Sequence, residues 1–167
     1  MHIRPATPDD LDAIMSIQAE AYGQTLIESR ACMAERLNMQ DSLSLIAAQH
    51  NQAIAYLLMY CSTPGKITPF NGPFIACPEN TTIKTLYLHD LAVSNSGRGL
   101  GIATQLIEQA RSCAQKLGCH SMSLVAVQDA LPFWQKNGFH PLTANEQQNL
   151  TLNSYADNAV FCIATVD

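Results

Sequence analysis

The sequence predicts a single α/β domain over residues 1–167, built as a mixed sheet with helices on both faces. The chain has 167 residues, of which 47% are hydrophobic, and this suffices for one core of ordinary size. Segments with the apolar spacing of helices alternate along the chain with segments of strand type. No internal repeat, low-complexity tract or linker interrupts that order. These observations favour one compact α/β unit.

The first part of the chain predicts two helices and then an antiparallel pair of strands. Thr7 is expected to cap the first helix, with Pro8 at its first helical position, and the second helix should begin near Ser29. Residues 43–48 and 53–60 have the composition of strands and flank a short polar turn. The apolar positions expected to face inward are Leu11, Ile14, Met15 and Ile17 in the first helix, and Met33 and Leu37 in the second.

Residues 61–84 contain too many proline and glycine residues for a regular element. An irregular connection of this length is often a binding loop or lid, and a passive surface excursion is the alternative.

The second half predicts a strand over 86–93, a glycine-rich turn and a long helix that ends at Gly118. A strand over 121–127 follows. Asp129 is expected to cap a short helix, and residues 159–165 should form the last strand.

The glycine-rich turn is the most informative segment for chemistry. Gly99 and Gly101 precede a helix, whose unpaired N–H groups and positive dipole end favour an oxyanion or phosphate. A P-loop is excluded because Ile102 and Ala103 follow instead of a Lys-Ser or Lys-Thr pair. A dinucleotide fingerprint would have Thr104 in place of its last glycine. A tight turn without any ligand remains the alternative.

Two motifs carry a family resemblance. Residues 98–103, Arg-Gly-Leu-Gly-Ile-Ala, resemble the R/Q-x-x-G-x-G/A motif of the GNAT superfamily of N-acetyltransferases, and the Asp-Leu-Ala-Val before them resembles its coenzyme-gripping strand. Residues 129–139 resemble the later A-x-x-F-Y-x-x-x-G-F segment, with Trp134 where tyrosine is usual. The resemblance implies a GNAT-like, mostly antiparallel sheet and acetyl-coenzyme A as the acetyl donor.

The resemblance also implies a coenzyme site. Ala92 and Val93 would pair with the pantetheine arm, and the Leu91 N–H would bond the acetyl carbonyl. Gln128 and Phe133 would lie near the pantetheine and the adenine end. The pyrophosphate would rest on the turn formed by Arg98, Gly99, Leu100, Gly101, Ile102, Ala103 and Thr104.

His89 is the best candidate for a base that takes the proton of an amine, because an imidazole titrates near working pH. Its strand resembles that of serotonin N-acetyltransferases, in which a histidine at this position serves in proton removal through water. Those enzymes carry a second histidine where this chain has Tyr87, which would hold a water or shape the pocket. A buried histidine that only fills the sheet face is the alternative.

Strand alternation should place Tyr87, His89, Leu91 and Val93 on one face of the sheet, and Leu88, Asp90 and Ala92 on the other. Asp90 would then point away from His89 and have a structural role. Trp134 leaves the general acid open, because an indole N–H donates a hydrogen bond but does not release its proton in this range. A packing role for Trp134 is the alternative.

Composition excludes several classes of partner. The net charge of −5 argues against nucleic acid. No apolar run is long enough for a membrane span, and no signal peptide is present, so a cytoplasmic protein is expected. The six cysteines have neither metal-site nor disulfide spacing, so no metal is expected. A homodimer is compatible with the sequence.

These observations predict an acetyl-coenzyme A dependent N-acetyltransferase that acts on a small-molecule primary amine by direct transfer in a ternary complex. Acetylation of a protein N-terminus or lysine is one alternative, and a coenzyme A binding module without turnover is another. The acceptor pocket would be built from residues 22–28, 61–84 and 140–158, which carry no recognisable pattern.

Overall fold

The computed structural model of the chain describes residues 1–40, 42–155 and 157–166. Their strands form one seven-stranded sheet in the order β1-β2-β3-β4-β5-β7-β6. Every neighbouring pair of these described strands is antiparallel except β4 and β5, which run parallel. The predicted mixed, mostly antiparallel sheet is therefore confirmed. The strands are β1 (His2–Pro5), β2 (Leu45–Gln49), β3 (Gln52–Ser62), β4 (Thr85–Val93), β5 (Ser121–Ala126), β6 (His140–Pro141) and β7 (Val160–Thr165).

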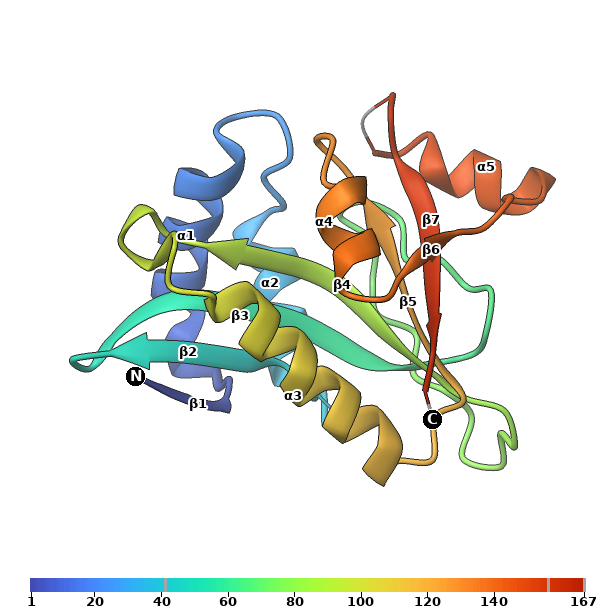
Figure 1. The fold of residues 1–167 in the computed structure, drawn as a ribbon, viewed down its shortest axis with the longest axis horizontal. Coiled ribbons are helices and arrows are strands. Elements are labelled where there is room, and N and C mark those ends of the chain that lie inside the picture. The colour runs from blue at the N-terminus through green and yellow to red at the C-terminus, as the bar shows by residue number, and fades with distance from the viewer. Residues whose placement is uncertain (41, 156, 167) are drawn as a thin grey trace.

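Helices cover both faces of this sheet, as predicted (Figure 1). α1 (Leu11–Tyr22) and α2 (Arg30–Asn38) pack on one face through Ile14, Ile17, Met33 and Leu37. α3 (Ile102–Lys116) packs on the other through Ile102, Leu106, Ile107 and Ala110. The remaining helices are α4 (Leu131–Lys136), α5 (Glu146–Leu152) and two short 3-10 turns at Pro8–Asp10 and Asn95–Gly97. No helix among the described residues combines the length and the apolar character that a membrane crossing requires.

Local capping follows the sequence at some helix ends and departs from it at others. Ser29 caps α2, and its hydroxyl accepts a 3.2 Å hydrogen bond from Cys32 N–H. The predicted cap by Asp129 is wrong, because Ala130 occupies the N-cap of α4. Asp129 has a positive φ of 58° and accepts a hydrogen bond from Asn158 instead. The short elements β1, β6 and α5 lie outside the sequence prediction, since they are too short for a clear period.

A β-bulge in β4 overturns the predicted alternation. Asp90 lies opposite Leu58, but the next partner, Met59, lies opposite Leu88, so His89 is an extra residue in the ladder. Leu88 and Leu91 therefore both face α3, while Asp90 bonds to Tyr56 on the α1 and α2 face. His89 also lies on that face. The expectation that Asp90 points away from His89 is wrong, because the bulge shifts the two-residue period by one position.

β4 and β5 separate beyond the middle of the sheet. Their parallel pairing covers Thr85–Leu88 of β4 and Ser121–Leu124 of β5, and it stops there although β4 continues to Val93. Figure 1 shows α4 at the open end of this gap, directly after β5. Among the described strands, the second half of β4 thus pairs with β3 alone.

Candidate active site

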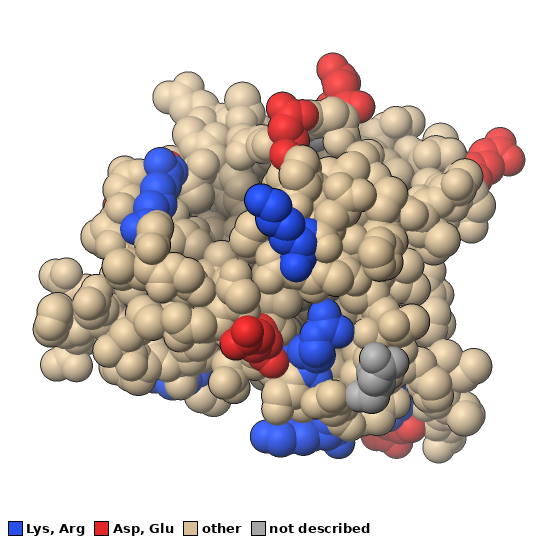
Figure 2. Space-filling model, viewed as in Figure 1, with Lys and Arg blue, Asp and Glu red and all other residues tan. Residues whose placement is uncertain are grey.

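The gap between β4 and β5 opens into a cavity of about 180 Å³. The space-filling view is hollowed in this region, between the end of β4 and α4, with a basic side chain on either side of the hollow and an acidic one at its upper edge (Figure 2). The walls combine the α1–α2 connection, the irregular segment 63–84, β4, β5 and α4. The lining residues are Tyr22, Leu26, Glu28, Phe70, Leu88, His89, Asp90, Leu91, Val125, Val127, Gln128, Ala130, Phe133, Trp134 and Tyr155.

The glycine-rich turn lies at the N-terminus of α3, as predicted. Gly101 is the N-cap residue in the left-handed region, with a φ of 70°, and Gly99 has a φ of 76°. A Cβ added at either glycine would meet no atom within 4 Å, so open space lies above the turn. Backbone conformation therefore requires these glycines, and the free N–H groups of the first helical turn remain available to a ligand.

The backbone of β4 directs further N–H groups into the gap. In an antiparallel ladder, pairs that exchange hydrogen bonds alternate with pairs that do not. Ser94 N–H donates to the Ile54 carbonyl over 2.8 Å, and Leu91 lies three positions earlier in the same ladder. The alternation therefore points the N–H groups of Leu91 and Val93 away from β3, toward the side that β5 has left. This is the orientation that recognition by strand addition requires.

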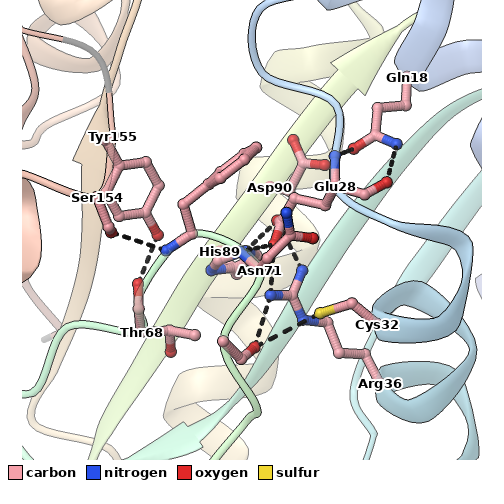
Figure 3. A network of polar contacts seen from close by, with 12 residues as sticks. Gln18, Glu28, Cys32, Arg36, Thr68, Asn71, His89, Asp90, Ser154 and Tyr155 are labelled. Carbon is pink, nitrogen blue, oxygen red and sulfur yellow. Dashed lines mark hydrogen bonds and ion pairs between the residues drawn. The ribbon is translucent and has the colours of Figure 1, made fainter.

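A buried salt bridge occupies the other side of the cavity. Glu28, only 3% exposed, accepts two hydrogen bonds from Arg36, of 2.7 and 2.6 Å, and Asn71 N–H donates to it over 2.8 Å. Its backbone is held by Gln18, whose amide both donates to and accepts from Glu28. Figure 3 shows how these groups converge from α1, α2, β4 and the 63–84 segment. α2, β4 and the 63–84 segment therefore hold the Glu28 carboxylate, and α1 holds its backbone.

His89 completes this arrangement. Its Nε2 lies 2.5 Å from Glu28 Oε1. Burial raises the pKa of Glu28, but the hydrogen bonds from His89 and Arg36 outweigh burial and lower that pKa to about 2. Glu28 is therefore a carboxylate and can only accept, so Nε2 carries the proton. The Nδ1 atom of His89 is buried and has no hydrogen-bond partner among the described residues.

Asp90 is held differently from Glu28. The hydroxyls of Tyr22 and Tyr56 donate to its two oxygens over 2.6 and 2.5 Å. Burial raises the pKa of Asp90 despite these bonds, and burial together with the Asp90 charge keeps the pKa of both tyrosines well above its ordinary value. The tyrosines are thus neutral donors. We refer to Glu28, Arg36, His89 and Asp90 as the buried charge cluster.

The other predicted site residues occupy different positions. Leu91, Gln128 and Phe133 line the cavity, whereas Tyr87 is fully buried and lies outside its lining. The Tyr87 hydroxyl is buried near Tyr155, and burial raises its pKa. Trp134 both lines the cavity and belongs to the hydrophobic core. Its ring packs edge-on against Phe133 and Phe139, at centroid distances of 5.2 and 5.4 Å.

The irregular segment 63–84 is tied down over the cavity. Tyr155 donates to the Thr68 carbonyl over 2.5 Å, and Ser154 accepts from Phe70 N–H over 2.9 Å. Gln148 on α5 donates to the Gly65 carbonyl over 2.7 Å. The segment is therefore anchored by the region around residues 145–155 and contributes Phe70 to the cavity wall, while its role as a binding loop stays a prediction.

Sequence reasoning missed Glu28 and Arg36 as members of the site. The 22–28 segment was expected to border the acceptor pocket, but no residue in it was singled out. Glu28 and Arg36 are eight positions apart, and the contact between them forms only when α2 packs beside the 63–84 segment. No group of three or more metal-ligating side chains occurs among the described residues.

Comparisons with known proteins agree with this geometry. Residues 11–139 match the family model of the acetyltransferase (GNAT) family. A stretch of 66 residues is 36% identical to the tRNA(Met) cytidine acetyltransferase TmcA of Saccharolobus islandicus, and it covers 40% of this chain but 9% of that protein.

Two solved structures show the same fold. The GNAT-like decarboxylase GphF in complex with isobutyryl-CoA superposes with a TM-score of 0.82 at 17% identity, covering 100% of both chains. The ribosomal-protein-S18-alanine N-acetyltransferase of Escherichia coli has a TM-score of 0.71 at 14% identity, covering 99% of this chain and 94% of that one.

Proposed function

Because the chain belongs to the acetyltransferase (GNAT) family and is an acyltransferase, we propose that it transfers an acetyl group from acetyl-coenzyme A to a small primary amine. The single observation that carries the amine assignment is the state of His89. His89 lines the cavity, and its Nε2 is fixed by the Glu28 carboxylate. Its Nδ1 has no hydrogen-bond partner among the described residues. A carboxylate that orients an imidazole in this way leaves the other ring nitrogen as a base.

The residues around the gap fit the coenzyme. Open space lies above Gly99 and Gly101, and the first turn of α3 offers unpaired N–H groups, which suits a pyrophosphate. The Leu91 and Val93 N–H groups point to the side where the pantetheine arm would extend β4. The thioester supplies the activated acetyl group, and the Leu91 N–H would donate to its carbonyl oxygen.

Proton movement follows from the buried charge cluster. An ammonium acceptor must first lose a proton, and Nδ1 of His89 takes it. The amine nitrogen then bonds to the acetyl carbon as the carbon–sulfur bond breaks. The second proton leaves the nitrogen for water, and water protonates the departing sulfur, so the products are an amide and a thiol.

Trp134 bears on the last of these steps. Its indole N–H can donate a hydrogen bond to a thiolate but cannot protonate it, and Tyr87, outside the cavity lining, is not placed to do so. We infer that water protonates the departing sulfur and that Trp134 forms part of the wall. A coenzyme-binding module without turnover is the alternative that a missing acid favours.

A thiol-release assay tests the proposed function. Purified protein is given acetyl-coenzyme A with polyamines, arylalkylamines, amino acids, aminoglycosides or short peptides. His89→Ala should lose most of the rate, roughly a hundredfold or more, while coenzyme binding by calorimetry is unchanged. His120→Ala, at an exposed histidine, is the matched control and should keep full activity.

Two results would count against the proposal. Tight coenzyme binding without thiol release over the whole panel would support the binding-module alternative. Turnover of peptides alone would assign the enzyme to protein acetylation. An active His89→Ala variant from pH 6 to 9 would remove the base assignment but leave the transferase function standing.

A further inference from the structure

The carboxyl group of Asp90 lies in the cavity wall and pairs with no lysine or arginine among the described residues. Arg36 is engaged by both oxygens of Glu28 and by the Gly72 carbonyl, so these two charges offset each other. Asp90 makes no salt bridge among the described residues, and its hydrogen-bond donors are neutral tyrosines. The residues that line the cavity include no lysine or arginine. In the proposed mechanism His89 starts as a neutral base, and with both carboxylates ionised the charges of the buried charge cluster then sum to −1.

Asp90 lines the cavity beside Leu91. The bulge at His89 turns its carboxylate into the cavity, and the next residue is Leu91, whose N–H points into the gap. The two tyrosine hydroxyls satisfy one hydrogen bond on each carboxylate oxygen, and a carboxylate can accept about four. Lone pairs thus remain for a charged donor. A buried carboxylate of this kind is costly to keep ionised unless a cation joins it.

We propose that Asp90 binds the ammonium group of the acceptor, and that the acceptor is a primary amine with no carboxylate beside its nitrogen. This inference rests on the proposed function and specifies the substrate of the same site. A zwitterionic amino acid would bring its own carboxylate to a wall that offers no cation and already holds Glu28 and Asp90. The aromatic side chains of Tyr22, Phe70 and Tyr155 provide an apolar surface for the rest of the molecule.

Proton transfer to His89 makes the cluster neutral. The ionisable groups that interact with Asp90 in the described part of the chain include Tyr22 from α1, Tyr56 from β3, His89 on its own strand, Glu28 from the α1–α2 connection and Arg36 from α2. When His89 holds the proton taken from the ammonium, two cations face two carboxylates. The released amine is then neutral, as attack on the thioester requires, and Asp90 no longer faces an excess charge.

A matched pair of substrates tests this assignment. 2-Phenylethylamine and L-phenylalanine differ by the carboxylate alone. The wild-type enzyme should acetylate 2-phenylethylamine with a kcat/KM at least about tenfold higher than for L-phenylalanine. Asp90→Asn keeps the shape of the side chain and removes its charge. It should raise KM for 2-phenylethylamine by about tenfold or more and change kcat by less than about threefold. The ratio of kcat/KM for 2-phenylethylamine to kcat/KM for L-phenylalanine should become smaller.

The controls separate a charge effect from a structural one. Asp9→Asn makes the same chemical change at an exposed carboxylate and should alter neither constant. Asp90→Glu restores the charge and should recover part of the lost affinity. Unchanged KM in Asp90→Asn, equal or better use of L-phenylalanine by the wild type, or turnover of peptides alone would overturn the inference. Coenzyme binding without acetylation of any amine would instead overturn the proposed function.

Discussion

The two sides of the cavity are built in opposite ways. The turn at residues 98–104 is one continuous segment that offers backbone groups, and Arg98 to Gly101 are exposed. The buried charge cluster consists of side chains from three separate segments, the α1–α2 connection, α2 and β4, and Arg36 is 1% exposed. A continuous backbone site can tolerate changes elsewhere in the fold, whereas an assembled charge cluster depends on the packing around it. Mutations on the two sides should therefore have different consequences.

Removing the charge of Glu28 should have the largest effect on stability. Glu28→Gln leaves the Arg36 guanidinium buried without a counter-charge, and breaking such a pair costs about 3–5 kcal/mol. Urea denaturation gives the free energy of unfolding. Asp12→Asn, which affects an exposed pair with Arg30, is the control and should cost about 0–1 kcal/mol.

A double variant keeps this test decisive if Glu28→Gln alone does not fold. Glu28→Gln with Arg36→Met removes the stranded cation as well and should recover a large part of the lost stability. A cost below about 1 kcal/mol for Glu28→Gln would show that the cluster is not the structural centre described above.

Acid should weaken the cluster through the same carboxylate. The pKa of Glu28 is lowered in the folded state to about 2, from an ordinary value of 4.5. Its contribution is complete above the ordinary pKa and is lost as the pH falls through the folded pKa, and a shift of this size corresponds to about 3 kcal/mol.

The measurement is the unfolding free energy of the wild type and Glu28→Gln between pH 7 and pH 2.5. The wild type should lose more stability on acidification than the variant. Asp10, whose pKa is lowered by its bonds to Arg4, contributes to both proteins and cancels in the comparison. If the free energy of unfolding fell equally with pH in both proteins, the stability would not depend on the ionisation of Glu28.

A mutation in the glycine turn should change the affinity for coenzyme A more than the stability of the fold. Gly101→Ala places a Cβ at a φ of 70°, which costs about 1–2 kcal/mol, and the Cβ projects into the space above the turn. The dissociation constant of coenzyme A should rise by about tenfold or more. Gly118→Ala, at the other end of α3 with a φ of 65°, has the same strain and open surroundings, so it should leave that constant unchanged.

The smallest stability effect is expected at Asp90. The folded protein raises the pKa of this carboxyl, so its ionisation at neutral pH opposes folding, and that opposition is absent below the ordinary pKa of 3.8. Asp90→Asn should therefore unfold at the same or slightly higher denaturant concentration than the wild type at pH 7, within about 1 kcal/mol. A loss well beyond this would show that Asp90 holds Tyr22 and Tyr56 in place and is a structural residue.

The sequence prediction succeeded where the signal was local. The strand, glycine turn and helix between residues 85 and 116 were recognised because their spacing and glycines lie within one segment. The prediction of a Ser29 cap also depended on neighbours only. The alternation along β4 failed at His89, because a bulge is decided by the pairing of β4 with β3 and leaves no mark in the period of a single strand.

The site residues divide in the same way. Four of the residues predicted from the motifs line the cavity: His89, Leu91, Gln128 and Phe133. Their chemical roles stay predictions. Asp90 was assigned a structural role and an orientation away from the site, and the bulge corrects that orientation. Glu28 was passed over, since a glutamate before a helix cap is usually a solvated surface residue.

By itself, the sequence determined the α/β order of elements, the glycine turn at the start of α3 and the family to which these motifs belong. Those features depend on residues close together in the chain and on backbone geometry. Only the tertiary structure decided which carboxylate orients His89, which one remains without a counter-charge and what covers the cavity. Burial creates these properties, because the charges of Glu28, Arg36 and Asp90 acquire their energies only when distant segments exclude water around them.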